Sequence, residues 1–357
     1  MKTIIFAGGV GTRLWPLSRK KSPKQFEKII GNKSTLQLAA ERLQPDFPWD
    51  TLYVSTGKAY VSTVADQLAK VPESHIIGEP EMRDVGPAVG LMTALLARES
   101  PNEPMAIIWS DHLVKNVELF RKILVNAGKI IEKKGDRIVF VAQKPRFASE
   151  NLGWIEYGKE VIRENGTAFH EFVDFQYRPD PETAKKYYKS GHHAWNLGYF
   201  VTTPKFLWSL YERFVPNLAK GLKDIVKSEK FQQTLEKIYP TLEKISFDNA
   251  ILESLNPKDA LVISENIEWS DIGAWEALKE ALENSTDKNV TQGKVMLTDT
   301  SDSLVYNYTN QTVTTIDVKG MLVVVTDDVV LVCPKGSVPK IKKFVESLSG
   351  TKNEHLV

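Results

Sequence analysis

A glycine-rich turn followed by a run of cations opens the chain. Residues 3–7 are apolar and partly β-branched, which predicts a buried first strand, and Gly8, Gly9 and Gly11 follow at once. Glycine adopts positive φ without steric cost, so backbone N–H groups can approach an anion closely. The cations that follow, with no acidic residue among them, are Arg13, Arg19, Lys20, Lys21 and Lys24. This combination predicts a polyphosphate site.

Two common phosphate-binding motifs do not fit this loop. A Walker loop needs Gly-Lys-Ser/Thr after its second glycine, whereas this chain has Gly11-Thr12-Arg13. The Rossmann fingerprint needs a third glycine, and Leu14 stands at that position. A solvated basic turn is the simpler alternative. Arg13, close behind Gly11, and Lys24 further on favour a binding loop instead.

The segments after the turn resemble one family. Residues 7–19 (AGGVGTRLWPLSR) and 23–26 (PKQF) are similar to the activation loop of sugar-phosphate nucleotidylyltransferases, and in particular to the mannose-1-phosphate guanylyltransferase branch. Further family motifs recur in order along almost the whole chain. The resemblance implies that Gly8, Gly9, Gly11 and Thr12 bind the nucleotide. It also implies that Arg13 and Lys24 bind the triphosphate and stabilise developing charge.

Composition limits the classes of protein and partner. The 357 residues are 42% hydrophobic and 25% charged, which is typical of a globular chain with one large and one small domain. Lys plus Arg (46) nearly balances Asp plus Glu (45), which argues against nucleic acid as the main partner. Cys333 is the only cysteine, so a reducing compartment is expected. We find no signal peptide and no membrane-spanning apolar run, so we expect a cytoplasmic protein without a membrane partner.

Strand and helix patterns alternate in the first part of the chain. Strands are predicted at 52–55, 75–78, 106–109 and 138–141, and helices at 36–43, 59–68, 88–98 and 117–133. This order predicts an α/β fold in which helices cover both faces of a largely parallel sheet. Ligands then bind beyond the carboxyl ends of the strands. The resemblance implies a Rossmann-like nucleotidyltransferase fold with a mixed sheet.

The pattern changes further along the chain. Residues 153–180 have a β pattern, helices are predicted at 183–188, 206–214, 231–238 and 275–282, and the polar residues 284–289 predict a linker. Short β runs follow at 294–297, 304–306, 313–318, 321–325 and 329–332, and an amphipathic helix at 339–348. We therefore expect a catalytic domain at 1–284 and a small all-β domain with a terminal helix at 290–357. The resemblance implies that the small domain is similar to a left-handed β-helix.

Two aspartates stand where a metal could bind. Asp111 follows an apolar run, and Asp271 precedes a predicted helix. A carboxylate at either position can bind a hard cation through oxygen, but it can equally cap a helix. The resemblance pairs Asp111 with Asp271 as ligands of Mg²⁺. His112 is interpreted as structural.

Residues 79–88 (EPEMRDVGPA) resemble the segment of the family that contacts the nucleobase. The resemblance implies that Glu79, Arg83, Pro87 and Ala88 bind the nucleotide. The intervening residues 84–86 depart from the family pattern, which leaves selectivity for GTP open. The alternative is a loop that enters a helix, with Pro87 in its first turn.

Four further residues are assigned to the sugar phosphate by resemblance: Gly153, Arg178, Asn196 and Asp248. Asp248 also fits a helix N-cap, and Glu253 is equally open between structure and sugar contact. Tyr177 and Leu197 replace a glutamate and a serine of the family, which leaves the identity of the sugar open. Core packing is the expected role of Trp154 and Trp195.

The resemblance implies an enzyme that converts GTP and α-D-mannose 1-phosphate to GDP-mannose and pyrophosphate. The sugar phosphate would attack the nucleotide α-phosphate in line, assisted by Mg²⁺. One alternative is transfer of this or another nucleotidyl group to a different sugar 1-phosphate. Another is a non-catalytic paralogue that binds a sugar nucleotide and regulates an enzyme. A homodimer built through the small domain is expected from the resembling enzymes.

Overall fold

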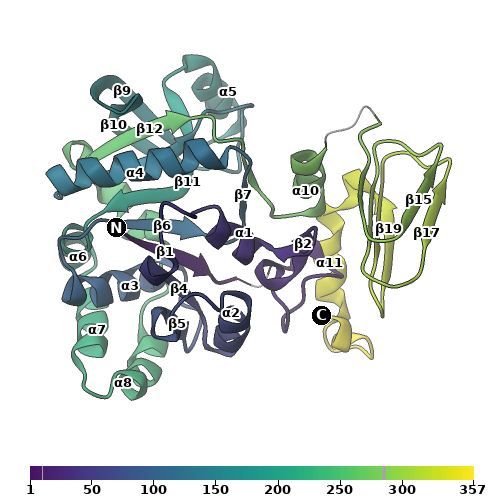
Figure 1. Ribbon diagram of the computed structural model, residues 1–357, viewed down its shortest axis with the longest axis horizontal. Coiled ribbons are helices and arrows are strands. Elements are labelled where there is room, and N and C mark those ends of the chain that lie inside the picture. Colours follow the sequence, from purple (N-terminus) through teal and green to yellow (C-terminus); the bar gives the residue numbers. More distant parts are fainter. Residues whose placement is uncertain (10, 284–286) are drawn as a thin grey trace. The chain divides into compact units, whose positions relative to one another are not determined.

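The computed structural model describes residues 1–9, 11–283 and 287–357, with Thr12 described through its backbone only. The chain forms two compact units (Figure 1). The first unit comprises Met1–Gly8, Ala40–Trp109 and Val114–Trp269, and the second comprises Gly9–Ala39, Ser110–Leu113 and Ser270–Val357. The second unit therefore combines segments from the beginning, the middle and the end of the chain. The division into domains 1–284 and 290–357 concerns consecutive segments and stays a prediction.

A nine-stranded mixed sheet forms the centre of the first unit. Its strands lie in the order β5 (Ile76–Glu79), β4 (Leu52–Gly57), β1 (Lys2–Ala7), β6 (Met105–Trp109), β11 (His193–Thr202), β8 (Ile138–Gln143), β12 (Ala260–Glu265), β10 (Thr167–Tyr177) and β9 (Gly153–Glu164). The strands from β5 to β6 are parallel, whereas β11 runs antiparallel to both of its neighbours. The mixed sheet implied by the resemblance is confirmed. The strands expected from alternation, which are β4, β5, β6 and β8, all run in one direction as predicted, and the antiparallel strand β11 lies between β6 and β8. The apolar, β-branched composition of β1, β6 and β8 explains why these strands are almost fully buried.

Helices cover this sheet. They are α2 (Val61–Gln67), α3 (Val85–Glu99), α4 (Val117–Lys133), α5 (Pro181–Ser190), α6 (Pro204–Phe214), α7 (Pro216–Lys227), α8 (Phe231–Ile238) and α9 (Phe247–Ala250). Figure 1 shows α3, α6, α7 and α8 grouped together, with α4 running along the sheet apart from that group. The grouped helices and the sheet share one large hydrophobic core. The helix α7 was missed by the sequence analysis, although Pro216 at its start is a helix-initiation signal.

The second unit contains a small β domain. A four-stranded sheet lies in the order β14 (Val290–Gln292), β16 (Leu304–Asn307), β18 (Met321–Val325) and β19 (Val330–Pro334), and β15 (Val295–Thr298) pairs with β17 (Val313–Ile316). All these pairings are parallel except that of β18 with β19. Short strands that return to parallel neighbours in two sheets are the arrangement of a β-helix, so the expected small β domain is confirmed. The predicted linker 284–289 lies partly outside the described residues.

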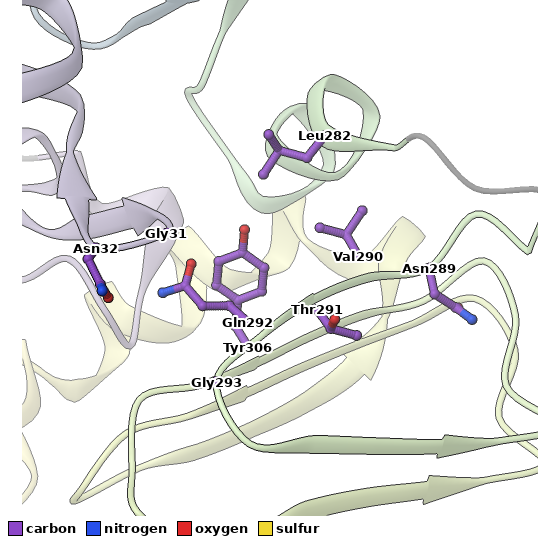
Figure 2. Close-up of a pocket in the computed structure, with 9 residues that line it drawn as sticks. All are labelled: Gly31, Asn32, Leu282, Asn289, Val290, Thr291, Gln292, Gly293 and Tyr306. Carbon is purple, nitrogen blue, oxygen red and sulfur yellow. The ribbon is translucent and has the colours of Figure 1, made fainter. Parts of the chain in front are cut away.

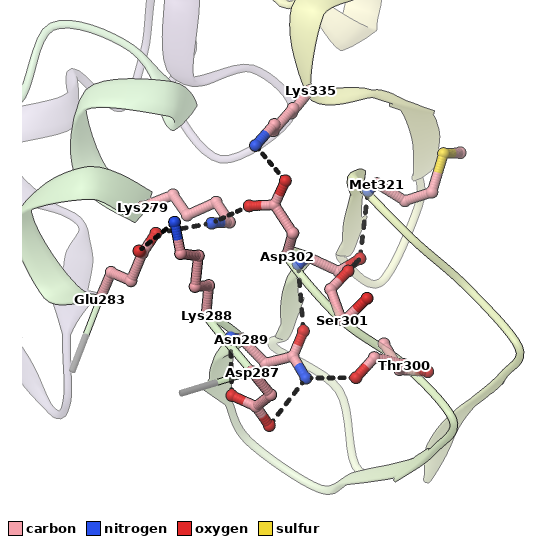
Figure 3. A network of polar contacts seen from close by, with 11 residues as sticks. Lys279, Glu283, Asp287, Lys288, Asn289, Thr300, Ser301, Asp302, Met321 and Lys335 are labelled. Carbon is pink, nitrogen blue, oxygen red and sulfur yellow. Dashed lines mark hydrogen bonds and ion pairs between the residues drawn. The ribbon is translucent and has the colours of Figure 1, made fainter. Parts of the chain in front are cut away.

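The second unit also contains the helices α10 (Trp275–Leu282) and α11 (Pro339–Leu348) and most of α1 (Thr35–Glu41). The ammonium group of Lys279, on α10, lies 2.9 Å from Glu283 and 2.8 Å from Asp302 of the β domain (Figure 3). Lys335 pairs with the other oxygen of Asp302. These contacts fix α10 against the β domain. No helix within the described residues combines the length and apolar character needed to cross a lipid bilayer.

Candidate active site

The glycine turn has the backbone geometry expected of an anion-binding loop. Gly9 has φ +100° and Gly11 φ +55°, a region that favours glycine. The carbonyl of Gly9 accepts a hydrogen bond from Gln25 Nε2, and that of Gly11 accepts one from Ser18 Oγ. A Cβ atom added at Gly8 or Gly9 would meet no atom within 4 Å, so the backbone here is open to a ligand. The loop therefore folds back on itself and leaves the glycine backbone accessible.

Lys24 is buried and paired. It lies in the 3₁₀ turn η2 (Lys24–Phe26), and its Nζ is 3.0 Å from Asp111 Oδ2 and 3.1 Å from the carbonyl oxygen of Ile272. Its aliphatic chain packs against Gly11, where an added Cβ would lie 2.7 Å from Lys24 Cγ. A buried ammonium group is costly unless it is paired. The structure therefore brings together Lys24 and Asp111, two residues that the sequence analysis assigned to the site.

Arg13 lies close to Asp271. A Cβ atom at Gly273 would be 3.2 Å from Arg13 Nη2 and 3.2 Å from Asp271 Oδ1, so both groups border the Gly273 backbone. Arg13 lies in the turn η1 (Thr12–Leu14) and is exposed. Gly273 was missed by the sequence analysis. The available signal was a glycine two residues after the candidate metal ligand.

The second unit holds both candidate metal ligands. Asp111 directly precedes β7 (His112–Val114), and Asp271 ends β13 (Trp269–Asp271); these two strands pair with each other. Lys24 Nζ reaches both the Asp111 carboxylate and the backbone carbonyl directly after Asp271. The two aspartates are therefore close neighbours.

Neither aspartate caps a helix. Asp111 is followed by a strand, and the N-cap of α10 is Ala274, which makes no side-chain cap bond. The capping interpretation of Asp111 and Asp271 is therefore wrong, because the chain after each residue does not enter a helix directly.

The aspartate pair suits a hard cation. Burial alone would raise the pKa of Asp111, but the charges of Lys24 and His112 hold it well below its usual range, so the carboxylate is ionised. No group of three or more His, Cys, Asp or Glu side chains that could hold a metal occurs among the described residues. Mg²⁺ is commonly bound by one or two carboxylates together with substrate phosphates, so two neighbouring carboxylates fit its requirements.

The expected nucleobase segment lies in the first unit, and Glu79 ends its strand β5. Ser55 Oγ donates to one carboxylate oxygen of Glu79 at 2.8 Å, and the hydroxyl of Tyr239 donates to the other at 2.7 Å. Burial raises the pKa of Glu79, although these two hydrogen bonds act in the opposite direction. The side chain is therefore held in one orientation by two neighbours that the sequence did not reveal.

The rest of this segment forms the start of α3. Asp84 caps the helix through its Oδ1, which accepts a hydrogen bond from Val85 N, so Pro87 lies in the first turn as expected. Pro87 and Ala88 are buried, and Ala88 belongs to the main core. Arg83 is half-buried and lies 3.4 Å from Glu81.

Gly86, one of the residues that departs from the family pattern, has a structural explanation. Its N–H donates to the carbonyl of Ile245, and an added Cβ would lie 2.6 Å from that oxygen. Its own carbonyl accepts a hydrogen bond from the hydroxyl of Tyr211. Only glycine allows this close approach between the start of α3 and the segment before α9.

Asp248 is not the N-cap of its helix. The cap of α9 is Ser246, whose Oγ accepts from the backbone N–H of Asn249, so the N-cap interpretation of Asp248 is wrong. Burial raises the pKa of Asp248, and the nearby charges of Glu253 and Asp84 add to that rise. Asp248 therefore lies near Asp84, at the start of α3.

Three of the four expected sugar-phosphate residues meet where the start of β9 lies between β10 and β11, a place that we call the sugar edge: Gly153, Arg178 and Asn196. Gly153 pairs with Tyr177 on one side and with Asn196 on the other. Arg178 follows Tyr177, is exposed, and donates its backbone N–H to the carbonyl of Leu152. An added Cβ at Gly153 would lie 2.9 Å from the ring of Phe175, so a larger residue here would require that ring to shift.

Tyr177 and Leu197, which replace a glutamate and a serine of the family pattern, differ in exposure. Tyr177 is 51% exposed, whereas Leu197 is 3% exposed and therefore directed into the core. Asn196 Oδ1 accepts from the N–H of Gly198 within a β-bulge of β11. Trp154 and Trp195 are fully buried, which confirms their expected packing role.

A separate pocket of about 580 Å³ lies in the second unit (Figure 2). It is lined by Gly31, Asn32, Leu282, Asn289, Val290, Thr291, Gln292, Gly293 and Tyr306. None of these residues is charged, and none was assigned to the site. A polyanion binds where cations converge, so this pocket does not suit a nucleoside triphosphate.

Comparisons with known proteins identify the family of this chain. Residues 2–288 match the family model described as nucleotidyl transferase, and residues 293–348 match that of the MannoseP isomerase/GMP-like beta-helix domain. The chain is 32% identical over 363 residues to a mannose-1-phosphate guanylyltransferase of Salmonella montevideo, covering 99% of this chain and 75% of that protein. A second such enzyme, from Escherichia coli, is 30% identical and is covered to 76%.

A solved structure shares the fold over the whole chain. The crystal structure described as mannose-1-phosphate geranyltransferase from Thermus thermophilus superposes with a TM-score of 0.86 at 27% identity, covering 98% of this chain and 99% of that one. The match therefore includes segments of both units. The chain therefore belongs to the nucleotidyl transferase family and, within it, to the mannose-1-phosphate guanylyltransferases.

Proposed function

We propose that this protein transfers the guanylyl group of GTP to α-D-mannose 1-phosphate and releases GDP-mannose and pyrophosphate. The observation that carries the proposal is the charge cluster of the second unit, in which Lys24 pairs with Asp111 and Arg13 borders Gly273 together with Asp271. The choice of this reaction is supported by the relatives that align with 99% of the chain, because they are named mannose-1-phosphate guanylyltransferase.

The reaction needs no nucleophile from the protein. The sugar 1-phosphate carries ionised oxygens, and one of them attacks the α-phosphorus of GTP while pyrophosphate leaves. The obstacle is repulsion between two polyanions, which is about 4 kcal/mol for each close pair of charges at about 4 Å and an effective dielectric of about 20. Fixed cations offset this repulsion and hold the in-line geometry. We assign this role to Arg13 and Lys24.

Asp111 and Asp271 are proposed to hold Mg²⁺. When bound, the ion would neutralise charge on the nucleotide phosphates. The contribution of the chain is to keep two carboxylates ionised and adjacent. Lys24 helps Asp111 in this, because its charge lowers the pKa of that carboxyl group.

The remaining assigned residues bind the two substrates. The backbone of Gly8, Gly9, Gly11 and Thr12 is proposed to bind phosphate, and Glu79, Arg83, Pro87 and Ala88 to form the nucleobase segment. Gly153, Arg178, Asn196 and Asp248 are proposed to bind the sugar phosphate. Arg178 supports this role because it is exposed at the sugar edge and can bind phosphate with two parallel hydrogen bonds.

The test is a panel of nucleoside triphosphates and sugar 1-phosphates, read by pyrophosphate release. We expect GTP with mannose 1-phosphate to give the highest kcat/KM. Tyr177, exposed at the sugar edge, is the feature that favours a different sugar, so glucose 1-phosphate belongs in the panel. A higher value for another pair would replace the proposed substrates, and no pyrophosphate from any pair would favour a regulatory paralogue.

We further propose that the protein works in the cytoplasm as a homodimer. The strand β19 lies at the edge of its sheet, with Val330 65% and Val332 56% exposed, and such an edge can pair with a second chain. Light scattering of the Val330→Lys/Val332→Lys double variant tests this. A dimer that persists in this variant would contradict a role for β19 in assembly.

A further inference from the structure

The segment that carries the proposed catalytic cations has its apolar side in the core of the second unit. Leu14, Trp15 and Leu17, which follow Arg13, belong to one hydrophobic cluster with residues of the β domain and of α11. The turn η1, which contains Arg13, packs against α11. Apart from Ile29, the other buried residues of this cluster lie between Ile272 and Leu348, about 255 to 335 positions away along the chain.

An ion pair fixes the segment at Arg19. Its guanidinium binds Asp328 through two parallel hydrogen bonds, Nη1 to Oδ2 at 2.7 Å and Nη2 to Oδ1 at 2.6 Å. Its Nε donates to the carbonyl of Pro16, which ties the pair back to the loop. Hydrogen bonding to Arg19 lowers the pKa of Asp328 to about 2. Arg19 therefore already has a carboxylate partner, although its position suggested a phosphate ligand.

Trp15 fixes the segment at a second point. Its indole Nε1 donates to the carbonyl of Leu356 at 2.8 Å, and its own carbonyl accepts from the indole Nε1 of Trp275 at 2.9 Å. The Trp15 ring also meets Phe344 of α11 edge to face, with centroids 5.4 Å apart. Trp275 lies on α10, which Lys279 links to Asp302 of the β domain (Figure 3). Trp15 is thus held on both its side chain and its backbone.

We infer that residues of the β domain position the catalytic loop, with Asp328 and the carbonyl of Leu356 as its two distant anchors. Arg13 lies two residues before Trp15, and Lys24 five residues after Arg19, so both cations flank the anchored stretch. A loop that carries charge-stabilising groups must hold them to within about 1 Å, because a misplacement of that size can cost about 10²-fold in rate. The inference rests on the catalytic roles proposed for Arg13 and Lys24.

The experiment compares Asp328→Ala with Asp327→Ala in the full-length protein. Asp327 is the exposed neighbour and serves as the matched control. We expect Asp328→Ala to lower kcat by about 3- to 30-fold, while Asp327→Ala stays within about twofold of the parent. The melting temperature is measured in parallel. Trp15→Phe is the second variant, for the case that Asp328→Ala does not fold. It keeps an aromatic ring and removes the hydrogen-bond donor to Leu356, and it should also lower kcat.

A double-mutant cycle with Arg13→Ala separates positioning from general stability. If Asp328 acts through the loop cations, adding Asp328→Ala to Arg13→Ala should lower kcat much less than it does in the parent. Equal effects in both backgrounds would overturn the inference, as would parent-like turnover in both Asp328→Ala and Trp15→Phe. Those results leave the proposed function intact as long as Arg13→Ala remains slow. Parent-like turnover in Arg13→Ala would instead overturn the proposed role of Arg13, and the inference with it.

Discussion

The two units, each of which holds some of the assigned residues, are built in different ways. In the first unit, the expected substrate residues lie at strand ends and at the start of a helix, on one continuous sheet with a large core. In the second unit, the cation loop has little regular structure of its own and depends on Asp328, Trp275 and Leu356. The first region is positioned by its own secondary structure, whereas the second is positioned by residues far away in the chain.

This difference matters for the roles of the two regions. Groups that bind the ground state of a substrate tolerate small shifts at a modest cost in affinity. Groups that stabilise charge in the transition state lose most of their effect when displaced. We therefore expect changes in the second unit to lower kcat and changes in the first unit to raise KM.

The largest effect is expected from Arg13→Ala. Removing this exposed guanidinium should lower kcat by about 10²- to 10³-fold, the usual scale for one preorganised charge-stabilising group. The melting temperature should change little, because Arg13 supports no core. Lys21→Ala, another exposed cation of the same loop, is the control and should stay close to the parent. Near-parent turnover in Arg13→Ala would remove the distinction between the two regions.

Gly11→Ala should lower kcat by about 10- to 100-fold, because the new Cβ displaces Lys24. That Cβ would lie 2.7 Å from Lys24 Cγ, on a backbone with φ +55°. Gly31→Ala is the matched control, since Gly31 has φ +59° and an added Cβ meets nothing within 4 Å. Both variants therefore carry the backbone strain, and only one moves Lys24. Equal loss in the two variants would mean that strain, not the position of Lys24, limits activity.

Asp271→Asn should raise the Mg²⁺ concentration needed for half-maximal activity by about tenfold, because it removes one charged oxygen ligand. The same should hold for Asp111→Asn, which in addition leaves buried Lys24 without its carboxylate. Asp111→Asn should therefore lower the melting temperature even without Mg²⁺, and Asp271→Asn should not. The melting temperature with and without Mg²⁺ checks this independently of turnover. An unchanged Mg²⁺ requirement in both variants would contradict the paired site.

Tyr239→Phe tests the first unit. It removes one of the two hydroxyls that orient Glu79, and we expect the KM for GTP to rise by about 3- to 10-fold with kcat nearly unchanged. Phe fills the same buried space, so the core remains packed. Tyr60→Phe, a hydroxyl outside the assigned site, serves as a control. A fall in kcat with KM unchanged would place Glu79 among the groups that act in the transition state.

The smallest effect is expected from Asp302→Asn, which weakens the link between α10 and the β domain. Hydrogen bonds from Lys279 and Lys335 lower the pKa of Asp302 from 3.8 to about 2. Because the pKa of Asp302 is lower in the folded state, its ion pairs with the two lysines stabilise the fold above about pH 4. This contribution is lost as the pH falls toward about 2. We expect the melting temperature at neutral pH to fall by about 1–3 °C. The difference from the parent should shrink on acidification, and a constant difference would show that the charge of Asp302 is not the cause.

Local patterns predicted much of the secondary structure. The helices α4, α8, α10 and α11 have the bounds expected from periodicity, and the short strands of the β domain are close to those expected. Apolar spacing is a local property, which explains this agreement. The N-cap of α9 was predicted wrongly, and the strand β11 was not predicted at all. The first depends on one local choice between Ser246 and Asp248, and the second on strand pairing over long distances.

The sequence by itself determined the composition of the site: the glycine turn, the cations behind it, the two aspartates and the order of the family motifs. Only the tertiary structure decided which of these groups meet. It paired Lys24 with Asp111, brought Asp271 beside Arg13, and assigned Arg19 to Asp328. The physical reason is that a motif specifies residue types over a few positions, while charge pairing and core packing join residues hundreds of positions apart once the chain has folded.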